Sequence, residues 1–280
     1  MTELQAKVQD VKPGSARSAV TPEVVIQPLK DLDGFGRCVE LQLEIWGYDE
    51  ADVIPRRMFL VAQRAGGQAL GAFDASLPGG EKIYANMIGF AMSIPGYRNG
   101  HSYLHSHMLA VRAGYRDFGI GRRLKLAQRD DAMARGIDLI EWTFDPLEIK
   151  NAYFNLERLG AISRRYVPNL YGDTTSELQA GLPTDRLYAE WWLRSKRVEA
   201  ALAGEKMARP ETQQAVTVPH QIYTWKRNEA ERAQARSVQA ANREALQKAF
   251  RDGLSAIGYT RDAENNGSYQ LGVWNEDLKY

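Results

Sequence analysis

Two histidines, two positions apart, are the residues of this sequence best suited to proton transfer. His105 and His107 lie in the run His105–Val111, whose apolar residues are typical of a strand. Side chains two apart on a strand point to one face, so both imidazoles are expected on a common surface. An imidazole titrates near neutral pH and can therefore act as a general base. The alternative is that hydrogen bonds within a sheet satisfy both rings.

A glycine-containing turn after this strand is suited to binding an anion. The run Arg116–Arg122 holds Gly119 and Gly121 directly before an expected helix. Glycines let backbone N–H groups approach a ligand, and the first helical turn offers unpaired N–H groups and the positive end of a dipole. With its arginines at the rim, the run predicts a pyrophosphate site. A plain structural turn is the alternative, because a lone Gly-x-Gly is weak evidence.

Other site types lack their required residues. The sequence has no Gly-x-Gly-x-x-Gly after its first strand and no Gly-Lys-Ser/Thr, which excludes the usual dinucleotide and P-loop signatures. Zinc bound by His101, His105 and His107 is an alternative role for these histidines. Because no cysteine or further histidine is nearby, no metal site is predicted.

Two acidic residues bracket the next expected strand end. Glu141 and Asp145 could bind an incoming ammonium group or relay its proton there. Capping of the following helix is an equally good role for Asp145. Trp191 and Trp192 lie in an alternating segment, which predicts a packed strand rather than an aromatic cage.

The candidate site residues lie on predicted strands and helices that alternate along the chain. Apolar spacing predicts helices at about 32–46, 119–135 and 148–159, the last ended by Gly160. The stripe Ile120, Leu124, Ala127 and Ala134 is expected to be the buried face of the second of these helices. Apolar or alternating segments predict strands at 24–26, 58–63, 69–75, 86–94, 103–111, 139–144, 164–170 and 187–193. Residues 23–195 are therefore expected to form one α/β domain with a mixed sheet.

The two ends of the chain have a different composition. Residues 1–22 are polar and are expected to be a flexible tail. Residues 196–280 predict an accessory subdomain of a strand at 216–222, a helix at about 225–252 and strands at 257–260 and 269–273. The mixed charges of that helix favour docking onto the core or a partner subunit over binding DNA.

The overall composition narrows the class of protein. The net charge is +1 with 25% charged residues, so no nucleic-acid partner is expected. The single cysteine, Cys38, excludes an intramolecular disulfide and is expected to be a buried apolar residue. No apolar run approaches the length of a membrane span, and a cytoplasmic protein without a membrane partner is expected.

The glycine turn and the strand before it resemble the signature of the GNAT superfamily of N-acyltransferases. That signature is an Arg/Gln-x-x-Gly-x-Gly/Ala loop after an L-x-V strand end, which Leu109, Val111 and Arg116–Gly121 match. The strings Ser-His-Met-Leu, Trp-Thr-x-Asp-Pro-Leu and Asn-Ala-x-Phe-Asn most resemble a branch of predicted GNAT proteins, some of them linked to amino-acid N-acylation. The resemblance covers about residues 24–195, and the carboxy-terminal subdomain is also similar to that branch.

The resemblance implies a fold and a coenzyme. It implies an α/β fold of the α+β type, with a mixed, mostly antiparallel sheet flanked by helices and a small C-terminal α/β subdomain. In the family the strand end binds pantetheine through its backbone, the loop binds the pyrophosphate of acetyl-CoA or another acyl-CoA, and the later helix brings an asparagine to the coenzyme. The residues expected to contact the coenzyme are Met108, Leu109, Val111, Arg116, Phe118, Gly119, Ile120, Gly121, Arg122, Asn151 and Asn155.

The resemblance also implies an activity, the transfer of an acetyl or succinyl group to a small-molecule amine or amino acid by direct attack. The run His105–Val111 resembles the His-x-His-x-Leu-Ala-Val of arylalkylamine N-acetyltransferases, in which the histidines assist deprotonation. His107 is the preferred base because it lies nearer the expected thioester, and His105 is the other candidate.

One departure from the family concerns the general acid. Many GNAT enzymes have a tyrosine four residues before the glycine that ends the later helix, whereas this chain has Leu156 there. Tyr153 and Tyr166 are the candidate acids, with ordinary packing as their alternative role. A catalytically inactive acyl-CoA-binding regulatory or assembly module is therefore the alternative function. Oligomeric state is left open, with a homodimer as the candidate assembly.

Overall fold

The computed structural model describes residues 21–48, 52–172, 179–207 and 210–274, and these form two sheets. Most of the expected tail at 1–22 lies outside this part of the chain. The first sheet has seven strands in the described residues, in the order β1-β2-β3-β4-β5-β7-β6, and the second has three, in the order β8-β10-β9. Among the described strand pairs β4 and β5 are parallel and the others are antiparallel. The predicted mixed, mostly antiparallel α/β fold is therefore confirmed.

The strands have the following bounds. The first sheet contains β1 (Val24–Pro28), β2 (Gln68–Asp74), β3 (Met87–Arg98), β4 (His101–Val111), β5 (Leu139–Phe144), β6 (Tyr166–Val167) and β7 (Arg186–Trp192). The second contains β8 (Gln214–Val218), β9 (Leu254–Arg261) and β10 (Gly267–Val273).

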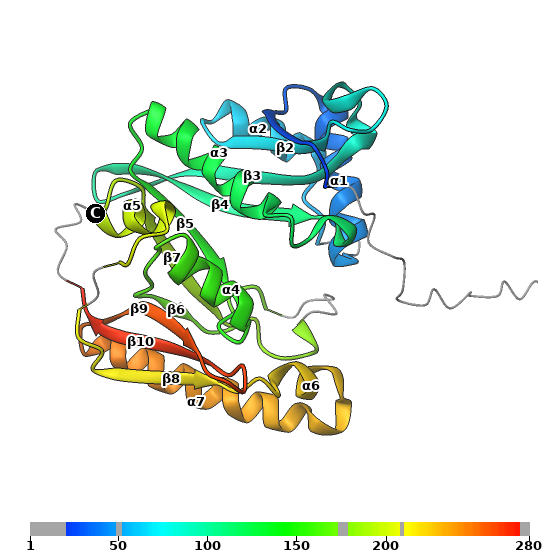
Figure 1. Cartoon of the computed structure of the whole chain (residues 1–280). Coiled ribbons are helices and arrows are strands. Elements are labelled where there is room, and N and C mark those ends of the chain that lie inside the picture. Colours follow the sequence, from blue (N-terminus) through cyan, green and yellow to red (C-terminus); the bar gives the residue numbers. More distant parts are fainter. Residues whose placement is uncertain (1–20, 49–51, 173–178, 208–209, 275–280) are drawn as a thin grey trace, which may run out of the picture.

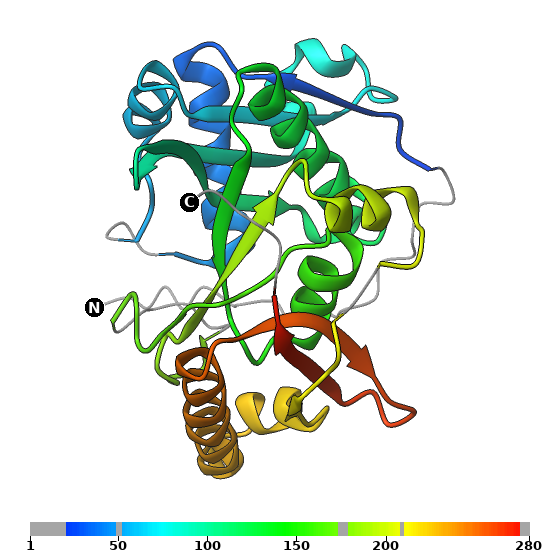
Figure 2. The same ribbon diagram turned by 90° about the vertical axis from the view of Figure 1, so that its left-hand side faces the viewer.

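The helices cover both faces of the first sheet, as Figure 2 shows. They are α1 (Leu32–Trp46), α2 (Arg56–Arg64), α3 (Ile120–Ala134), α4 (Ile149–Tyr153), α5 (Lys196–Ala203), α6 (Ile222–Arg227) and α7 (Arg232–Arg251), with short turns η1 (Gly80–Lys82), η2 (Tyr84–Asn86), η3 (Ala113–Tyr115), η4 (Phe154–Arg158) and η6 (Glu229–Glu231). α1 and α2 lie on one face, while α3, α4 and α5 lie on the other (Figures 1 and 2). In the described chain no helix combines the length and the apolar character needed to cross a membrane.

The second sheet packs against the first sheet and its helices (the first unit) through a shared hydrophobic core. It lies between α4 and α7 (Figure 1), and one hydrophobic cluster includes Leu156 of the first unit and Tyr259 and Tyr269 of the second. The Tyr269 hydroxyl donates to the Pro146 carbonyl at 2.8 Å, and Glu157 accepts from the backbone N–H of Tyr259 at 2.6 Å. Residues after 195 are thus packed onto the sheet that precedes them.

The strand expected at 58–63 is wrong, because these residues belong to the helix α2. A short apolar run cannot be assigned to strand or helix by periodicity alone. Its buried residues, Phe59 and Ala62, are three apart, which is helical spacing. Pro55 precedes the helix, where its missing N–H costs no hydrogen bond.

Four further predictions, three of helices and one of a strand, differ from the structure. The helix expected at 148–159 is a short α4 that continues as the π-helical turn η4. The strand expected at 216–222 ends at Val218, and the long helix is divided at Asn228 into α6 and α7. Ala134 is exposed, whereas the polar residues Lys125 and Gln128 are buried on α3.

Candidate active site

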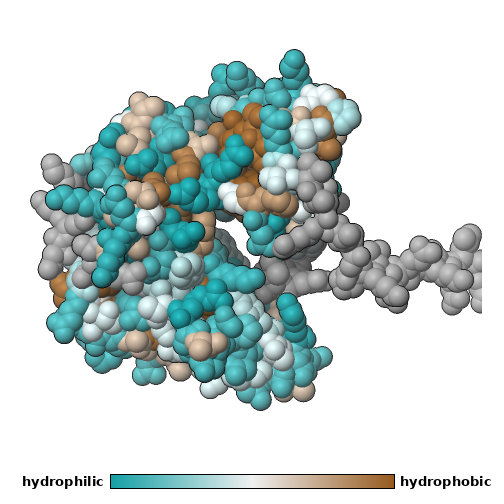
Figure 3. Space-filling model, viewed as in Figure 1, coloured by the Kyte–Doolittle hydropathy of each residue, from teal (hydrophilic) through white to brown (hydrophobic). Residues whose placement is uncertain are grey.

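A wedge opens between β4 and β5 at the centre of the first sheet. These parallel strands pair only at Leu104↔Ile140 and His105↔Glu141 within the described register. Beyond this point they diverge, as Figure 1 shows, and the surface is hollowed at the same place in Figure 3. Among the residues that the structure describes, no strand lies beside this edge of β4 beyond His105, and the backbone groups there need other hydrogen-bond partners.

A β-bulge in β4 marks the point where the wedge begins. Ser93 pairs with Ser106 and Met92 pairs with Met108, so His107 is the extra residue. Residues two apart on a regular strand point to the same face, but the bulge turns Ser106 and Met108 to opposite faces. Ser106 donates a hydrogen bond to Gln128 of α3, whereas Met108 packs in the cluster with α1 and α2. His105 and His107 lie with their ring centroids 6.2 Å apart.

The register determines which backbone groups of β4 face the wedge. The N–H of Arg112 donates to the Ile88 carbonyl of β3 at 2.9 Å. Hydrogen-bonded and non-hydrogen-bonded pairs alternate in an antiparallel ladder, so Leu109 and Val111 turn their N–H and C=O groups away from β3. Met108 is the exception among the expected coenzyme residues of this strand, because its backbone is turned toward β3.

The glycine turn places the start of α3 beside this free edge. Gly119 is the N-cap residue with φ 73°, and as a glycine it has no side chain to cap the helix. Gly121, two residues later, lies so close to β4 that an added Cβ would be 3.6 Å from the Leu109 side chain. A helix start capped by glycine suits an anion, because its first amides have no partner within the helix. Ile120 anchors the turn because its side chain is buried, whereas Phe118 is partly exposed.

The arginines near the turn differ in their hydrogen-bond partners and exposure. Arg122 donates to the Leu202 carbonyl at the end of α5 at 3.1 Å, and Arg123 donates to the Val24 carbonyl. Arg116 is exposed. The positive charge at the rim is therefore partly fixed by backbone carbonyl groups.

A charged cluster containing the two sequence-predicted acid–base residues His105 and Glu141 lies on the face opposite α3. Glu141 is 2% exposed, and its Oε2 accepts from Arg98 and from Arg165, each at 3.1 Å. His105 Nδ1 lies 3.7 Å from Glu141 Oε1. The Arg165 guanidinium lies 3.5 Å from the centroid of the Tyr188 ring. The structure therefore places His105 beside Glu141 and near His107.

The surroundings set the charge of two members of this cluster. Burial raises the pKa of Glu141, but the interaction with His105 and the charges of Arg165 and Arg98 outweigh it, so the pKa is below its ordinary value. Burial, with a contribution from the charge of His105, lowers the pKa of His107. His107 is therefore neutral at neutral pH, as a general base must be.

The two asparagines expected to contact the coenzyme differ in their surroundings. Asn151 is exposed on α4. Asn155 is 1% exposed in η4, and its Nδ2 has no hydrogen-bond partner in the described chain. Leu156 is fully buried in the core shared with the second sheet.

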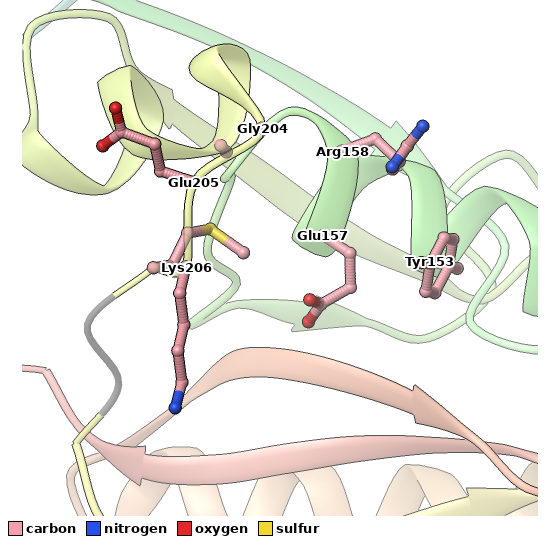
Figure 4. Close-up of a pocket in the computed structure, with 8 residues that line it drawn as sticks. Tyr153, Glu157, Arg158, Gly204, Glu205 and Lys206 are labelled. Carbon is pink, nitrogen blue, oxygen red and sulfur yellow. The ribbon is translucent and has the colours of Figure 1, made fainter.

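Tyr153 is not brought together with the two histidines. It lines a cavity of about 620 Å³ with Glu157, Arg158 and residues 204–207. In Figure 4 Tyr153 and Glu157 point from one side of the helix toward the second sheet. α4 and the histidine cluster lie on opposite faces of the first sheet.

The other candidate acid and the second acidic residue have structural partners. Tyr166 donates to Asp185, and burial together with this bond raises the pKa of Tyr166. Asp145 accepts from the Leu147 N–H at 2.8 Å and from Lys226 at 3.1 Å. Asp145 thus stabilises the turn before α4 and its contact with α6.

Sequence reasoning missed several residues of this region. Arg98, Arg165 and Tyr188 come from β3, from before β6 and from β7, and no spacing relates them to the histidines. Lys125 could have been found, because it lies one helical turn after Gly121 and beside the expected apolar stripe. In the described residues no group of three or more His, Cys, Asp or Glu side chains is placed to hold a metal ion.

No family model matches the sequence, and no curated protein matches it either. Among solved structures the chain is similar to NAA60 of Arabidopsis thaliana in complex with acetyl-CoA, with 13% identity, 60% of this chain and 99% of that chain covered, and a TM-score of 0.48. It is similar to a putative acetyltransferase of the GNAT family from Desulfovibrio desulfuricans, with 12% identity, coverage of 61% and 99%, and a TM-score of 0.47. It is also similar to the ribosomal-protein-S18-alanine N-acetyltransferase from Escherichia coli, with 16% identity, coverage of 61% and 95%, and a TM-score of 0.46.

Proposed function

We propose that this chain is an acyl-CoA-dependent N-acyltransferase of the GNAT type. The observation that supports it most is the wedge between β4 and β5, whose free strand edge leads to a helix with glycine at its N-cap. A strand edge with unpaired amides suits the pantetheine arm, and the helix start suits a diphosphate. The residues present therefore fit a coenzyme A thioester.

The histidine cluster is suited to activating an amine. An amine must lose a proton as its nitrogen attacks the thioester carbonyl carbon, and the neutral His107 imidazole can accept that proton. Glu141, held as a carboxylate, can orient His105 and support positive charge that develops beside it. When the tetrahedral intermediate collapses, the carbon–sulfur bond breaks and the coenzyme leaves as a thiolate that needs a proton.

The acceptor is proposed to be a small-molecule amine or amino acid. The face that carries the histidines also carries Arg98, Arg165, Tyr188 and the hydrogen-bonded pair Thr143 and Tyr171. Guanidinium groups beside aromatic rings suit an acceptor that has a carboxylate as well as an amine. The transferred group is proposed to be acetyl or succinyl.

Release of free thiol from acyl-CoA tests this function. Purified protein is mixed with acetyl-CoA or succinyl-CoA and a panel of amines, amino acids and short peptides, and thiol is measured with time. Amine-dependent release, with the acylated amine identified by mass spectrometry, is the expected result. Tight CoA binding without thiol release from any member of the panel would favour the inactive binding module instead.

A further inference from the structure

Lys125 of α3 brings a buried amino group to the closed end of the wedge. It is 4% exposed. Its Nζ lies 2.9 Å from the Ser106 hydroxyl of β4 and 3.6 Å from the centroid of the Trp142 ring of β5. Ser106 and Trp142 directly follow His105 and Glu141, the last residues at which the two strands pair. The amino group thus lies between the strands where they part.

This position is costly for a residue with only a packing role. Burial alone lowers the pKa of Lys125 well below its ordinary value, and no charged side chain of the described residues contributes to the shift. A buried ammonium without a carboxylate partner is unfavourable, and Leu or Met would fill the same volume at no such cost.

The polar groups around Lys125 are also incompletely paired. Ser106 donates to Gln128 Oε1 at 3.0 Å, but the Gln128 Nε2 is buried with no partner in the described chain. Buried polar groups in proteins are nearly always hydrogen-bonded, so an unpaired one calls for an explanation. The closed end of the wedge therefore has hydrogen-bonding capacity left for a ligand.

The wedge separates Lys125 from the histidines. Lys125 and Ser106 lie on the face covered by α3, while His105 lies with Glu141 on the opposite face. With its diphosphate at the start of α3, a coenzyme would run along the α3 side of the wedge, and the amine would come from the histidine side. The two proton transfers of the proposed reaction would then take place on opposite faces of the sheet.

We propose that Lys125 is the general acid that protonates the coenzyme thiolate. The inference rests on the proposed function and supplies the acid that Leu156 leaves unassigned. As the carbon–sulfur bond breaks, its electron pair goes to sulfur, an N–H bond of the Lys125 ammonium breaks, and an S–H bond forms. The amine proton is by then on His107, and water returns one proton to Lys125 and takes one from His107, so the products are amide and free CoA thiol.

The chemistry of a buried lysine suits this step. An exposed lysine has a pKa of about 10.4 and a thiol one of about 8.5, so an ordinary lysine gives up its proton to a thiolate reluctantly. Burial lowers the pKa of Lys125 below this ordinary value, and a lower pKa makes its ammonium a stronger proton donor to a thiolate. Lysines tuned by burial are used in catalysis for this reason.

The test compares wild type with Lys125→Met, Lys125→Arg and the control Lys248→Met, which changes an exposed lysine of α7. The first readout needs no turnover: the pKa of the bound CoA thiol, followed by the ultraviolet absorbance of the thiolate. An ammonium beside sulfur favours the thiolate, so this pKa is expected to rise by about one pH unit or more in Lys125→Met and to stay low in Lys125→Arg.

The second readout is kcat across pH. Loss of the acid is expected to lower kcat by about 100-fold in Lys125→Met. The fall in kcat at alkaline pH is expected to disappear in the same variant. In Lys125→Arg kcat stays low although the charge remains, because a guanidinium does not release its proton. CoA affinity is expected to change by less than about threefold, a difference well under 1.4 kcal/mol.

Two results would overturn the role of Lys125 alone: an unchanged thiol pKa with kcat within threefold of wild type in Lys125→Met, or an acyl group found on Lys125 by mass spectrometry, which would make it a nucleophile. If the wild-type protein binds CoA but releases no thiol, the proposed function is wrong, and the pKa of the bound thiol still shows whether Lys125 lies beside the sulfur. If the wild-type protein does not bind CoA, the proposed function and the role of Lys125 are both wrong. Thermal unfolding checks that each variant is folded. If Lys125→Met does not fold, the comparison of wild type with Lys125→Arg tests the role of Lys125.

Discussion

At the scale of single residues, His107, the proposed base, is the extra residue of the β-bulge. The bulge places its ring beside His105 in partly buried surroundings, which keep the imidazole neutral at neutral pH. Glu141 is also buried, but the guanidinium groups of Arg98 and Arg165 keep its carboxylate ionised. The cluster thus combines the neutral imidazole of His107 with the negative charge of Glu141.

Replacing His107 by Gln is expected to lower kcat by about 100-fold while CoA affinity stays within about threefold. Because burial lowers the pKa of His107, the acid limb of the wild-type kcat/KM profile should lie below about pH 6.5, and the variant should lack it. The control is His220→Gln, which changes an exposed histidine. An acid limb that persists in His107→Gln would assign the base to another group.

Replacing Glu141 by Gln is expected to lower the free energy of unfolding by about 1–3 kcal/mol at pH 7, since Arg98 and Arg165 lose their partner but are partly exposed. The pKa of Glu141 is lowered by folding, so its contribution is present above the unfolded value of about 4.3 and is lost as pH falls through the folded value. Urea unfolding at pH 7 and pH 3 should show the difference from wild type shrinking. An equal difference at both pH values, or the same loss in the exposed control Glu244→Gln, would contradict this account.

At the scale of elements, the start of α3 and the free edge of β4 form one surface. Gly119 needs its positive φ, whereas Gly121 has no such need and has room for a Cβ. Neither backbone conformation nor packing therefore requires glycine at position 121, as the proposed coenzyme site does. This distinction allows the fold and the coenzyme site to be tested separately.

Gly121→Leu is expected to weaken CoA binding by at least about tenfold, or 1.4 kcal/mol, because its side chain would cover the amides of the first turn. Its melting temperature should stay close to that of wild type, since an added Cβ meets only ordinary contact. Isothermal calorimetry and thermal unfolding check both. Gly36→Leu is the control, because it adds the same side chain to a helix at a position where a Cβ meets open space. Equal CoA affinity in wild type and Gly121→Leu would remove the diphosphate from this turn.

Most elements could be predicted from the sequence because their signals are local. The strand at 103–111, the helix from Gly119 and the strand at 139–144 have clear periodicity and turn residues, and all three were predicted in the right place. α2 was missed because a short apolar run fits either element. The π-helical turn η4 was missed because its i→i+5 bond, Leu159 N–H to the Phe154 carbonyl, leaves no mark in the spacing.

Only those residues of the candidate site that are neighbours in the sequence could be predicted from it. His105 and His107 were found because they are two apart on one strand. Arg98 and Arg165 reach Glu141 from 43 and 24 positions away, and tertiary structure alone brings them there. Lys125 was not predicted because a lysine on a helix is usually solvated, although its place beside the apolar stripe was a signal in the sequence.

At the scale of the whole molecule, the second sheet is part of one folded unit with the first. Lys226 of α6 is a link between them, with its side chain 8% exposed and bonds to Asp145 and Glu148 at 3.1 and 3.0 Å. Burial lowers the pKa of Lys226, but these two carboxylates outweigh it, so the pKa is raised. Both carboxylates precede α4, so α6 helps to hold one side of the wedge.

Lys226→Met is expected to lower the free energy of unfolding by about 2–3 kcal/mol, because two partly buried carboxylates lose their partner. The raised pKa means that this contribution is complete below the unfolded value of about 10.4 and is lost only as pH rises through the folded value, so the loss should be equal at pH 6 and pH 8. Urea unfolding followed by tryptophan fluorescence measures it. Lys248→Met, at an exposed pair on α7, should cost far less. Equal losses in the two variants would make the Lys226 contact unimportant.

The most direct test of the account is a crystal structure of the protein with CoA. The account predicts density for the diphosphate on the amides of Ile120, Gly121 and Arg122, continuing as a pantetheine arm along the free edge of β4 at Val111 and Leu109 toward the closed end of the wedge. Density for CoA elsewhere, with side chains filling the space between β4 and β5, would contradict it.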